Sequence, residues 1–234
     1  MATYSSTIPV IQTDEATRTQ FLVRVYQHLA LAVVAFIGFE TLLFTSGLAE
    51  RFARFLFETG GFAWLLILGG FAIVSAITSR AAYDLGNPSA QYVGLFGLSA
   101  AEAVIFAPFL WYVFESESGT SDVTLAAITT LIGFAALTVV AMVTRRDLSV
   151  LRPLLIWGGV AAIGLIIAAV AFGFTLGPIF SVAMIALAGA SILYQTQRIV
   201  REYPAGAYVG AAVSLFGSLM MMFWYVLRLF VGRD

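Results

Sequence analysis

Long apolar segments alternate with short polar ones along almost the whole chain. An α-helix needs about twenty mostly apolar residues to cross the hydrocarbon core of a bilayer. Seven segments meet this condition: 26–46, 62–79, 91–114, 123–144, 153–174, 177–197 and 206–230. Backbone groups in hydrocarbon must bond to one another, so these segments are predicted to be helices rather than strands. The pattern predicts an all-α integral membrane protein with seven transmembrane helices.

Turn-forming residues lie between the apolar segments. Asn87 and Pro88 precede the third segment, and Asp122 is predicted to be the N-cap of the fourth. No internal repeat or low-complexity stretch divides the chain. We therefore expect a polar cytoplasmic tail over 1–20 and one transmembrane domain over 21–234.

The connector Ala49–Glu58 has an amphipathic pattern of its own. Phe52, Phe55 and Leu56 share one face of a helix drawn over this stretch. The other face carries charged residues, namely Glu50, Arg51, Arg54 and Glu58. This pattern favours a short helix in the membrane interface, and the alternative is a simple extension of the first span.

Composition agrees with a membrane protein and excludes several chemistries. Hydrophobic residues make up 61% and charged residues 11%, against roughly 45–50% and 25% in soluble domains. The chain has no cysteine and a single histidine, His28, so thiol catalysis and histidine-rich metal sites are excluded. It has no lysine for a Schiff base, and its net charge of −1 gives no basic face for nucleic acid. We expect no enzymatic activity and no cofactor.

All twelve basic residues are arginines, and their distribution predicts the orientation. Eight would face the cytoplasm if the N-terminus is inside: Arg18, Arg24, Arg80, Arg145, Arg146, Arg152, Arg198 and Arg201. The other side would hold Arg51, Arg54, Arg228 and Arg233. By the positive-inside rule, the chain is expected in the inner (plasma) membrane with its N-terminus cytoplasmic and its C-terminus outside.

Two acidic residues lie inside apolar segments, where an unpaired charge is costly. Glu102 is near the middle of the third segment. Six residues later, Pro108 cannot donate to the carbonyl of Val104, which leaves a free acceptor within about one turn of Glu102. Glu40 lies deep in the first segment. Both are candidates for an ion path or a proton sensor. For Glu102, the alternative is a protonated side chain that only hydrogen-bonds to a neighbouring helix. For Glu40, it is a helix tilt that brings the side chain to the outer lipid headgroups.

Small residues recur at every fourth position in the last segment. They are Gly206, Gly210, Ser214 and Ser218. A stripe of this kind lets helices approach closely. It predicts a central position for the last helix, and ordinary packing between two helices is the alternative.

Three motifs give the chain a resemblance to a known family. They are TRRDLSVLRPLL after the fourth segment, ILYQTQRI at the end of the sixth, and AAVSLFGSLMMMFWYVLRLF in the last. Together they resemble the Bax inhibitor-1 family, and within it the bacterial YccA-like branch. The resemblance implies six transmembrane helices wrapped around a central C-terminal helix.

The resemblance also implies candidate functions. Known members include pH-sensitive calcium leaks, suppressors of stress-induced cell death, and a modulator of a membrane-anchored AAA protease. In the leak members two aspartates sense pH, and their positions correspond here to Gln195 and Ser218. Neither side chain titrates near neutral pH. Arg80 and Arg228 match arginines that pair with acids in those members, so they are candidates for holding a closed state.

Two functions from different classes follow from these observations. The first is a slow leak of cations, calcium among them, gated by the intramembrane carboxylates. The second is a non-conducting modulator of a membrane-anchored AAA protease in membrane-protein quality control. The intramembrane acids favour the leak, and the missing aspartates favour the modulator.

Overall fold

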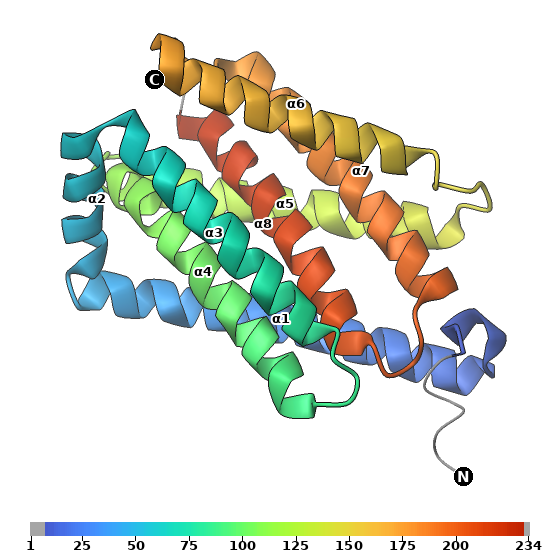
Figure 1. Cartoon of the computed structure of the whole chain (residues 1–234). Helices are drawn as coiled ribbons and strands as arrows, with labels where there is room; N and C mark the ends of the chain where they lie inside the picture. Colours follow the sequence, from blue (N-terminus) through green and yellow to red (C-terminus); the bar gives the residue numbers. More distant parts are fainter. Residues whose placement is uncertain (1–7, 232–234) are drawn as a thin grey trace.

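The computed structural model describes residues 8–231, and this part of the chain is helical throughout (Figure 1). A short 3₁₀ helix, η1 (Val10–Gln12), precedes eight α-helices. These are α1 (Glu15–Thr45), α2 (Leu48–Thr59), α3 (Gly61–Ala82), α4 (Pro88–Phe114), α5 (Gly119–Val143), α6 (Leu151–Phe172), α7 (Pro178–Glu202) and α8 (Tyr208–Val231). Every helix except η1 and α2 is long and apolar enough to cross a membrane, so the prediction of seven spans is confirmed.

The first helix begins earlier than the apolar pattern predicted. α1 starts at Glu15, so the end of the predicted tail, residues 15–20, is helical; residues 1–7 lie outside the described part. Asp14 is the N-cap, and its carboxylate accepts hydrogen bonds from the hydroxyl and the backbone N–H of Thr17 at 2.7 and 3.0 Å. These bonds lower the pKa of the Asp14 carboxyl. The cap, rather than hydrophobicity, decides where α1 begins.

The start of α5 corrects the predicted role of Asp122. The helix begins at Gly119 with Ser118 at the N-cap position, and Asp122 lies in the first turn, where it accepts a hydrogen bond of 2.7 Å from the Ser118 hydroxyl. A side chain at Gly119 would put its first carbon 2.1 Å from the carbonyl oxygen of Val113. Only glycine fits such a tight turn between α4 and α5, and the helix therefore starts there. The predicted turn at Asn87 and Pro88 is present, and Asn87 is also the N-cap of α4, where its side chain accepts a hydrogen bond of 3.1 Å from the backbone N–H of Ala90.

The amphipathic connector forms a helix separate from α1. Gly47 has a φ of 72°, a left-handed conformation that ends α1 before α2 starts. α2 lies across the end of α1 and packs on α4 (Figure 1). Its buried residues are Ala49, Ala53 and Leu56. Phe55 is 55% exposed and Phe52 is half-buried, so this part of the apolar face is open to the surroundings of the protein.

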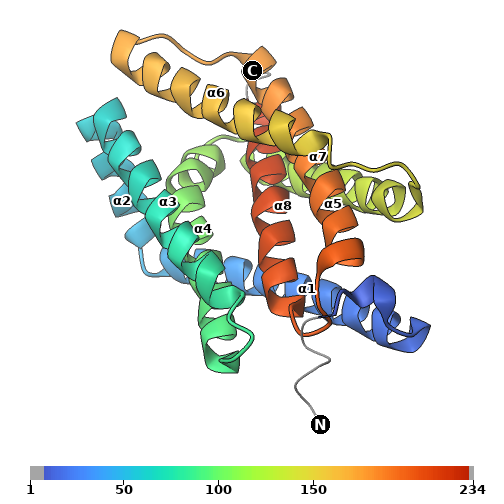
Figure 2. The same ribbon diagram turned by 45° about the vertical axis from the view of Figure 1, so that its right-hand side comes forward.

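α8 lies at the centre of the bundle, between α3 and α4 on one side and α7 on the other (Figure 2). It packs against α1, α3, α4, α5 and α7, and 67% of its apolar span is buried. α6 has only 6% of its span buried and packs mainly on α7. The fold is therefore the expected helical bundle around the last helix, with α6 as an outer layer.

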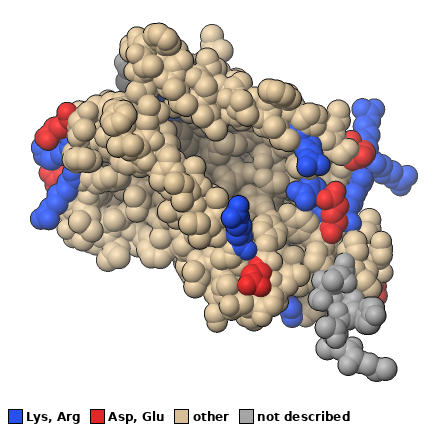
Figure 3. Space-filling model, in the orientation of Figure 1, with Lys and Arg blue, Asp and Glu red and all other residues tan. Residues whose placement is uncertain are grey.

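Charged side chains on the face seen in Figure 3 gather at two opposite sides of the molecule. One group surrounds α2, and the other surrounds the loops at the opposite end. A broad uncharged surface separates them and contains a hollow. This pattern is typical of a protein that crosses a bilayer, because charges avoid the hydrocarbon.

Candidate functional site

A hydrogen-bonded polar cluster joins α7 to α8. The Gln195 side-chain amide donates to the hydroxyls of Ser191 and Ser218, at 2.8 Å each. The two serine hydroxyls lie 2.9 Å apart. The structure therefore brings together the two positions, Gln195 and Ser218, that correspond to the aspartate pair of the leak members. An amide and hydroxyls hold the two helices together here without any charge.

A second cluster extends from this point toward the end of α3. Tyr83 follows α3 directly, and its hydroxyl hydrogen-bonds to Ser214 and, at 2.8 Å, to the hydroxyl of Tyr203. Ser218 donates to the backbone carbonyl of Ser214 at 3.4 Å, which connects the two clusters. Burial raises the pKa of the Tyr83 hydroxyl above its usual value. The connected groups thus stay neutral over the physiological range of pH.

The small-residue stripe of α8 contacts this network rather than the backbone of another helix. A side chain at Gly210 would put its first carbon 2.6 Å from Cδ1 of the Tyr83 ring. Ser214 binds the hydroxyl of the same tyrosine, and Ser218 binds α7. Gly206 lies before α8, in a turn closed by a hydrogen bond of 2.9 Å from the backbone N–H of Ala207 to Pro204.

The two intramembrane acids are both buried, with 7% of each residue exposed. Both carboxylate oxygens of Glu40 lack a hydrogen-bond partner within the described residues. Glu102 likewise forms no ion pair within this part of the chain. Such groups are rare in membrane helices, because the bilayer offers nothing to compensate their charge.

The structure does not bring Glu40 and Glu102 together. Aromatic rings pair along α1 and α4, Phe36 with Phe106 and Phe44 with Phe114, so the two helices run side by side in the same direction. This register places the two acids about eight residues apart along the pair, or roughly 12 Å. They act as separate sites.

Glu102 lies on the other side of α8 from the Gln195 cluster. Phe106, one turn after Glu102, stacks on Phe223 and meets Trp224 edge-on. Ser218 lies about one turn before Phe223 on α8, just as Glu102 lies one turn before Phe106 on α4. The two residues are therefore at a similar depth in the membrane. Ser218 faces α7, whereas Glu102 approaches α8 from α4. α8 separates the neutral network from the buried carboxylate.

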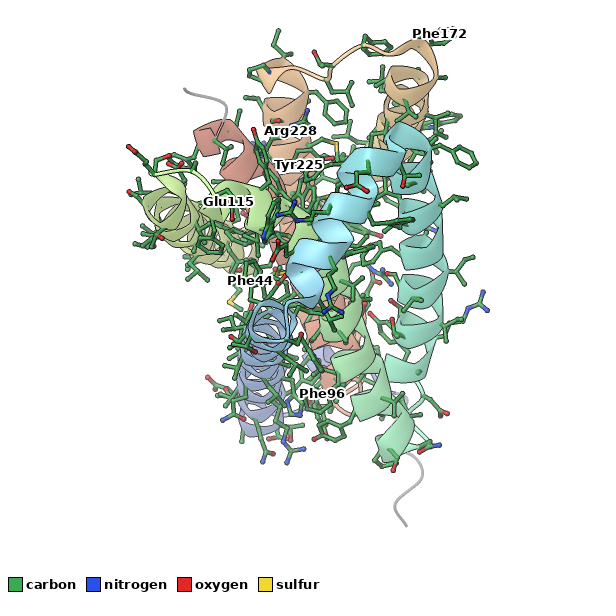
Figure 4. All side chains as sticks on the ribbon, turned by 90° about the vertical axis from the view of Figure 1, so that its left-hand side faces the viewer. Phe44, Phe96, Glu115, Phe172, Tyr225 and Arg228 are labelled. Carbon is green, nitrogen blue, oxygen red and sulfur yellow. The ribbon has the colours of Figure 1, made fainter. Side chains whose placement is uncertain are left out.

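The two candidate closed-state arginines form no ion pair among residues 8–231. Arg80 is exposed at the end of α3. Arg228 donates a hydrogen bond to the backbone carbonyl of Leu176 and so ties the end of α8 to the α6–α7 loop. Figure 4 shows Arg228 near Tyr225, in the half of the molecule away from Phe96.

A third polar cluster was not expected from the sequence. Three threonine hydroxyls, on Thr130, Thr138 and Thr196, are buried without a hydrogen-bond partner in the part of the chain that the structure describes. Tyr26 of α1 lies beside the last two. Thr130 and Thr138 lie eight residues apart on α5, but threonine in an apolar segment gives no signal, and only packing could reveal that Tyr26 and Thr196 lie beside Thr138. Buried polar groups of this kind are where ordered water is found in proteins.

The site holds no ready-made cage for a metal. Over residues 8–231, no three acidic or histidine side chains converge. A cation at Glu102 would therefore take its other ligands from water, hydroxyls or backbone carbonyls. Oxygen ligands of these types suit calcium.

Comparison with known proteins agrees with the geometry of the bundle. A family described as inhibitor of apoptosis-promoting Bax1 has a sequence model that matches residues 18–234, nearly the whole chain. No curated protein matches the chain. The matched range includes all of the transmembrane helices except the first turn of α1, together with the Gln195 cluster and both buried acids.

Proposed function

Because the chain belongs to the Bax inhibitor-1 family, we propose that this multi-pass membrane protein lets cations leak slowly across the bilayer. Calcium is the ion that an oxygen-lined path would suit best. In this proposal the protein is not an enzyme, and it needs no cofactor. The membrane is the inner (plasma) membrane of the cell.

The observation that carries the proposal is the burial of Glu102 and Glu40 without an ion-pair partner among residues 8–231. A carboxylate inside a membrane protein costs several kcal/mol unless a charge or polar group compensates it. A passing cation provides that compensation. A residue with only a packing role would not need a carboxylate, because an apolar side chain of similar size packs there without this cost.

The arrangement around α8 explains why the leak would be slow. α8 fills the centre of the bundle, and the neutral bonds of Gln195 and Tyr83 hold α7 and the end of α3 against it. A cation that reaches Glu102 would have to pass this packed helix to cross the bilayer. Because Gln195 and Ser218 carry no titratable group, their contact stays closed when the pH changes.

Calcium flux into proteoliposomes tests the proposal. Glu102→Gln keeps the shape of the side chain and removes its charge, so the flux should fall, by roughly tenfold if one ion–ligand interaction is lost. Glu115→Gln is the matched control, because Glu115 is exposed at the end of the same helix. That variant should conduct like the parent.

Two results would contradict the leak. One is a parent flux no higher than that of empty liposomes, and the other is an equal flux in Glu102→Gln and the parent. Either would leave the second candidate, a modulator of a membrane-anchored AAA protease. The observation that favours it is the neutral Gln195–Ser218 contact, which replaces a titratable pair. Its test is whether the purified protein changes the rate at which such a protease degrades a membrane substrate.

A further inference from the structure

An apolar cavity lies between α2 and the two helices next to it. Its volume is about 410 Å³, within the roughly 300–1,000 Å³ of small-molecule sites. The lining residues come from the end of α1, from α2 and from the middle of α4. They are Leu43, Leu48, Ala49, Arg51, Phe52, Phe55, Val104 and Ala107.

The cavity is open to the surroundings of the protein. Phe55 is 55% exposed and Val104 is 42% exposed, although both line the cavity. Val104 belongs to a transmembrane helix, so this opening faces the hydrocarbon of the bilayer. The molecules that surround it there are lipid chains.

Arg51 is the only charged residue that lines the cavity. Among residues 8–231 it has no ion-pair partner. Arg54, one turn away, does not line the cavity. It is paired with Glu50 at 2.8 Å, and its guanidinium lies 5.7 Å from the centre of the Trp111 ring. One arginine of α2 is therefore satisfied within the protein, and the other is available for a ligand.

We propose that this cavity binds one phospholipid with an anionic headgroup. An acyl chain lies along Phe52, Phe55 and Val104, and the phosphate group pairs with Arg51. The apolar lining matches the chain, and the single cation at the edge matches the headgroup. The short helix α2 is thus a lipid-binding element. This inference is independent of the cation leak.

Native mass spectrometry of the full-length protein in detergent tests the site. The probes are phosphatidylglycerol, which is anionic, and phosphatidylcholine, which has no net charge. The parent should retain one phosphatidylglycerol molecule about fivefold more strongly than phosphatidylcholine, the effect of one arginine at the interface. Arg51→Gln should abolish this preference, because it lowers the retention of phosphatidylglycerol more than that of phosphatidylcholine, whose choline group already neutralises its phosphate.

Two further variants separate the headgroup from the chain. Val104→Trp fills the cavity and should reduce the retention of both lipids. Arg54→Gln is the matched control, because it removes a paired charge of the same helix outside the cavity, and it should keep the parent's preference. A thermal unfolding curve for each variant shows that it is folded.

The proposal is wrong if Arg51→Gln retains phosphatidylglycerol as the parent does. It is also wrong if Arg54→Gln loses the preference to the same extent, because the attraction would then be a general one to basic residues. Unchanged retention of both lipids by a folded Val104→Trp variant would place the lipid elsewhere on the protein.

Discussion

At the scale of single residues, Tyr83 is the side chain that organises one end of the bundle. It follows a transmembrane helix, covers Gly210 of α8 and hydrogen-bonds to Ser214 and Tyr203. The sequence indicated that Gly210 was needed for close packing. It did not indicate that the partner would be a tyrosine from a loop.

Gly210→Ala should destabilise the protein by about 1–3 kcal/mol. The added carbon would lie 2.6 Å from the Tyr83 ring, whose position is held by two hydroxyl contacts. Gly217→Ala is the matched control, because no atom lies within 4 Å of a first carbon at that position of the same helix. Thermal unfolding in detergent compares the two. Equal stability of the variants would mean that Tyr83 moves aside without cost.

The Tyr83 hydroxyl should also make stability depend on pH in alkaline solution. Burial raises its pKa in the folded state above the ordinary tyrosine value of about 10. The unfolded chain therefore loses this proton first, so the contribution to stability is complete below about pH 10 and is lost as the pH rises through the folded pKa.

Tyr83→Phe should remove this part of the alkaline destabilisation. Unfolding midpoints measured between pH 8 and pH 11 would show a smaller decrease than in the parent. Tyr112→Phe, which changes a tyrosine that is 55% exposed, should keep the parent's slope. A variant Tyr83→Phe with the same slope as the parent would exclude the tyrosine as the source.

At the scale of elements, the contact between α3 and α4 is a close approach of two backbones. A first carbon on Gly94 would lie 2.5 Å from the carbonyl oxygen of Thr78 and 2.6 Å from the backbone nitrogen of Ala82. Backbone atoms of a helix cannot rotate away as a side chain can. Small residues at such crossings are what allow transmembrane helices to pack tightly.

Gly94→Ala should therefore push α3 away from α4 and lower the free energy of unfolding by about 3 kcal/mol, the upper end of the usual cost of overpacking. The cost should exceed that of Gly210→Ala, where the obstacle is a side chain. Gly69→Ala on α3 is the control, since nothing lies within 4 Å of its added carbon. Thermal unfolding in detergent would rank the three variants. A stable Gly94→Ala variant would show that the helices can shift apart without loss.

At the scale of the whole molecule, the distribution of arginine predicts an orientation for the bundle. Eight of the twelve arginines lie toward the side predicted to be cytoplasmic, and Arg233 on the other side lies outside the described residues. α8 is a continuous helix of 24 residues, enough to cross the bilayer. Seven full spans would put the two termini on opposite sides of the membrane, so we predict a C-terminus outside.

A C-terminal alkaline phosphatase fusion should accordingly be active, because that enzyme works only outside the cytoplasm. A C-terminal fluorescent protein that matures only in the cytoplasm should be dark. Both outcomes follow from the positive-inside rule. A bright fluorescent fusion with inactive phosphatase would mean that α8 enters the membrane and returns, which leaves six full spans.

The sequence by itself determined the number of spans, the presence of a short helix between the first two, and the central place of the last helix. The first two features depend on the length and period of apolar runs, and the third on a stripe of small residues; all are local properties of the chain. The turn at Asn87 and Pro88 was predictable from its residue types. The first turns of α1 and the start of α5 were not, because a cap at Asp14 and a tight turn at Gly119 override hydrophobicity.

Only the tertiary structure decided which residues meet. It placed Gln195 against Ser218, kept Glu40 apart from Glu102, and left Arg80 and Arg228 without ion pairs among residues 8–231. It also formed a cavity beside Arg51 and brought Tyr26 next to Thr138 and Thr196, which are distant in the sequence. The physical reason is that such contacts depend on the rotation and depth of each helix. Packing against several neighbours sets both, and no single apolar segment encodes them.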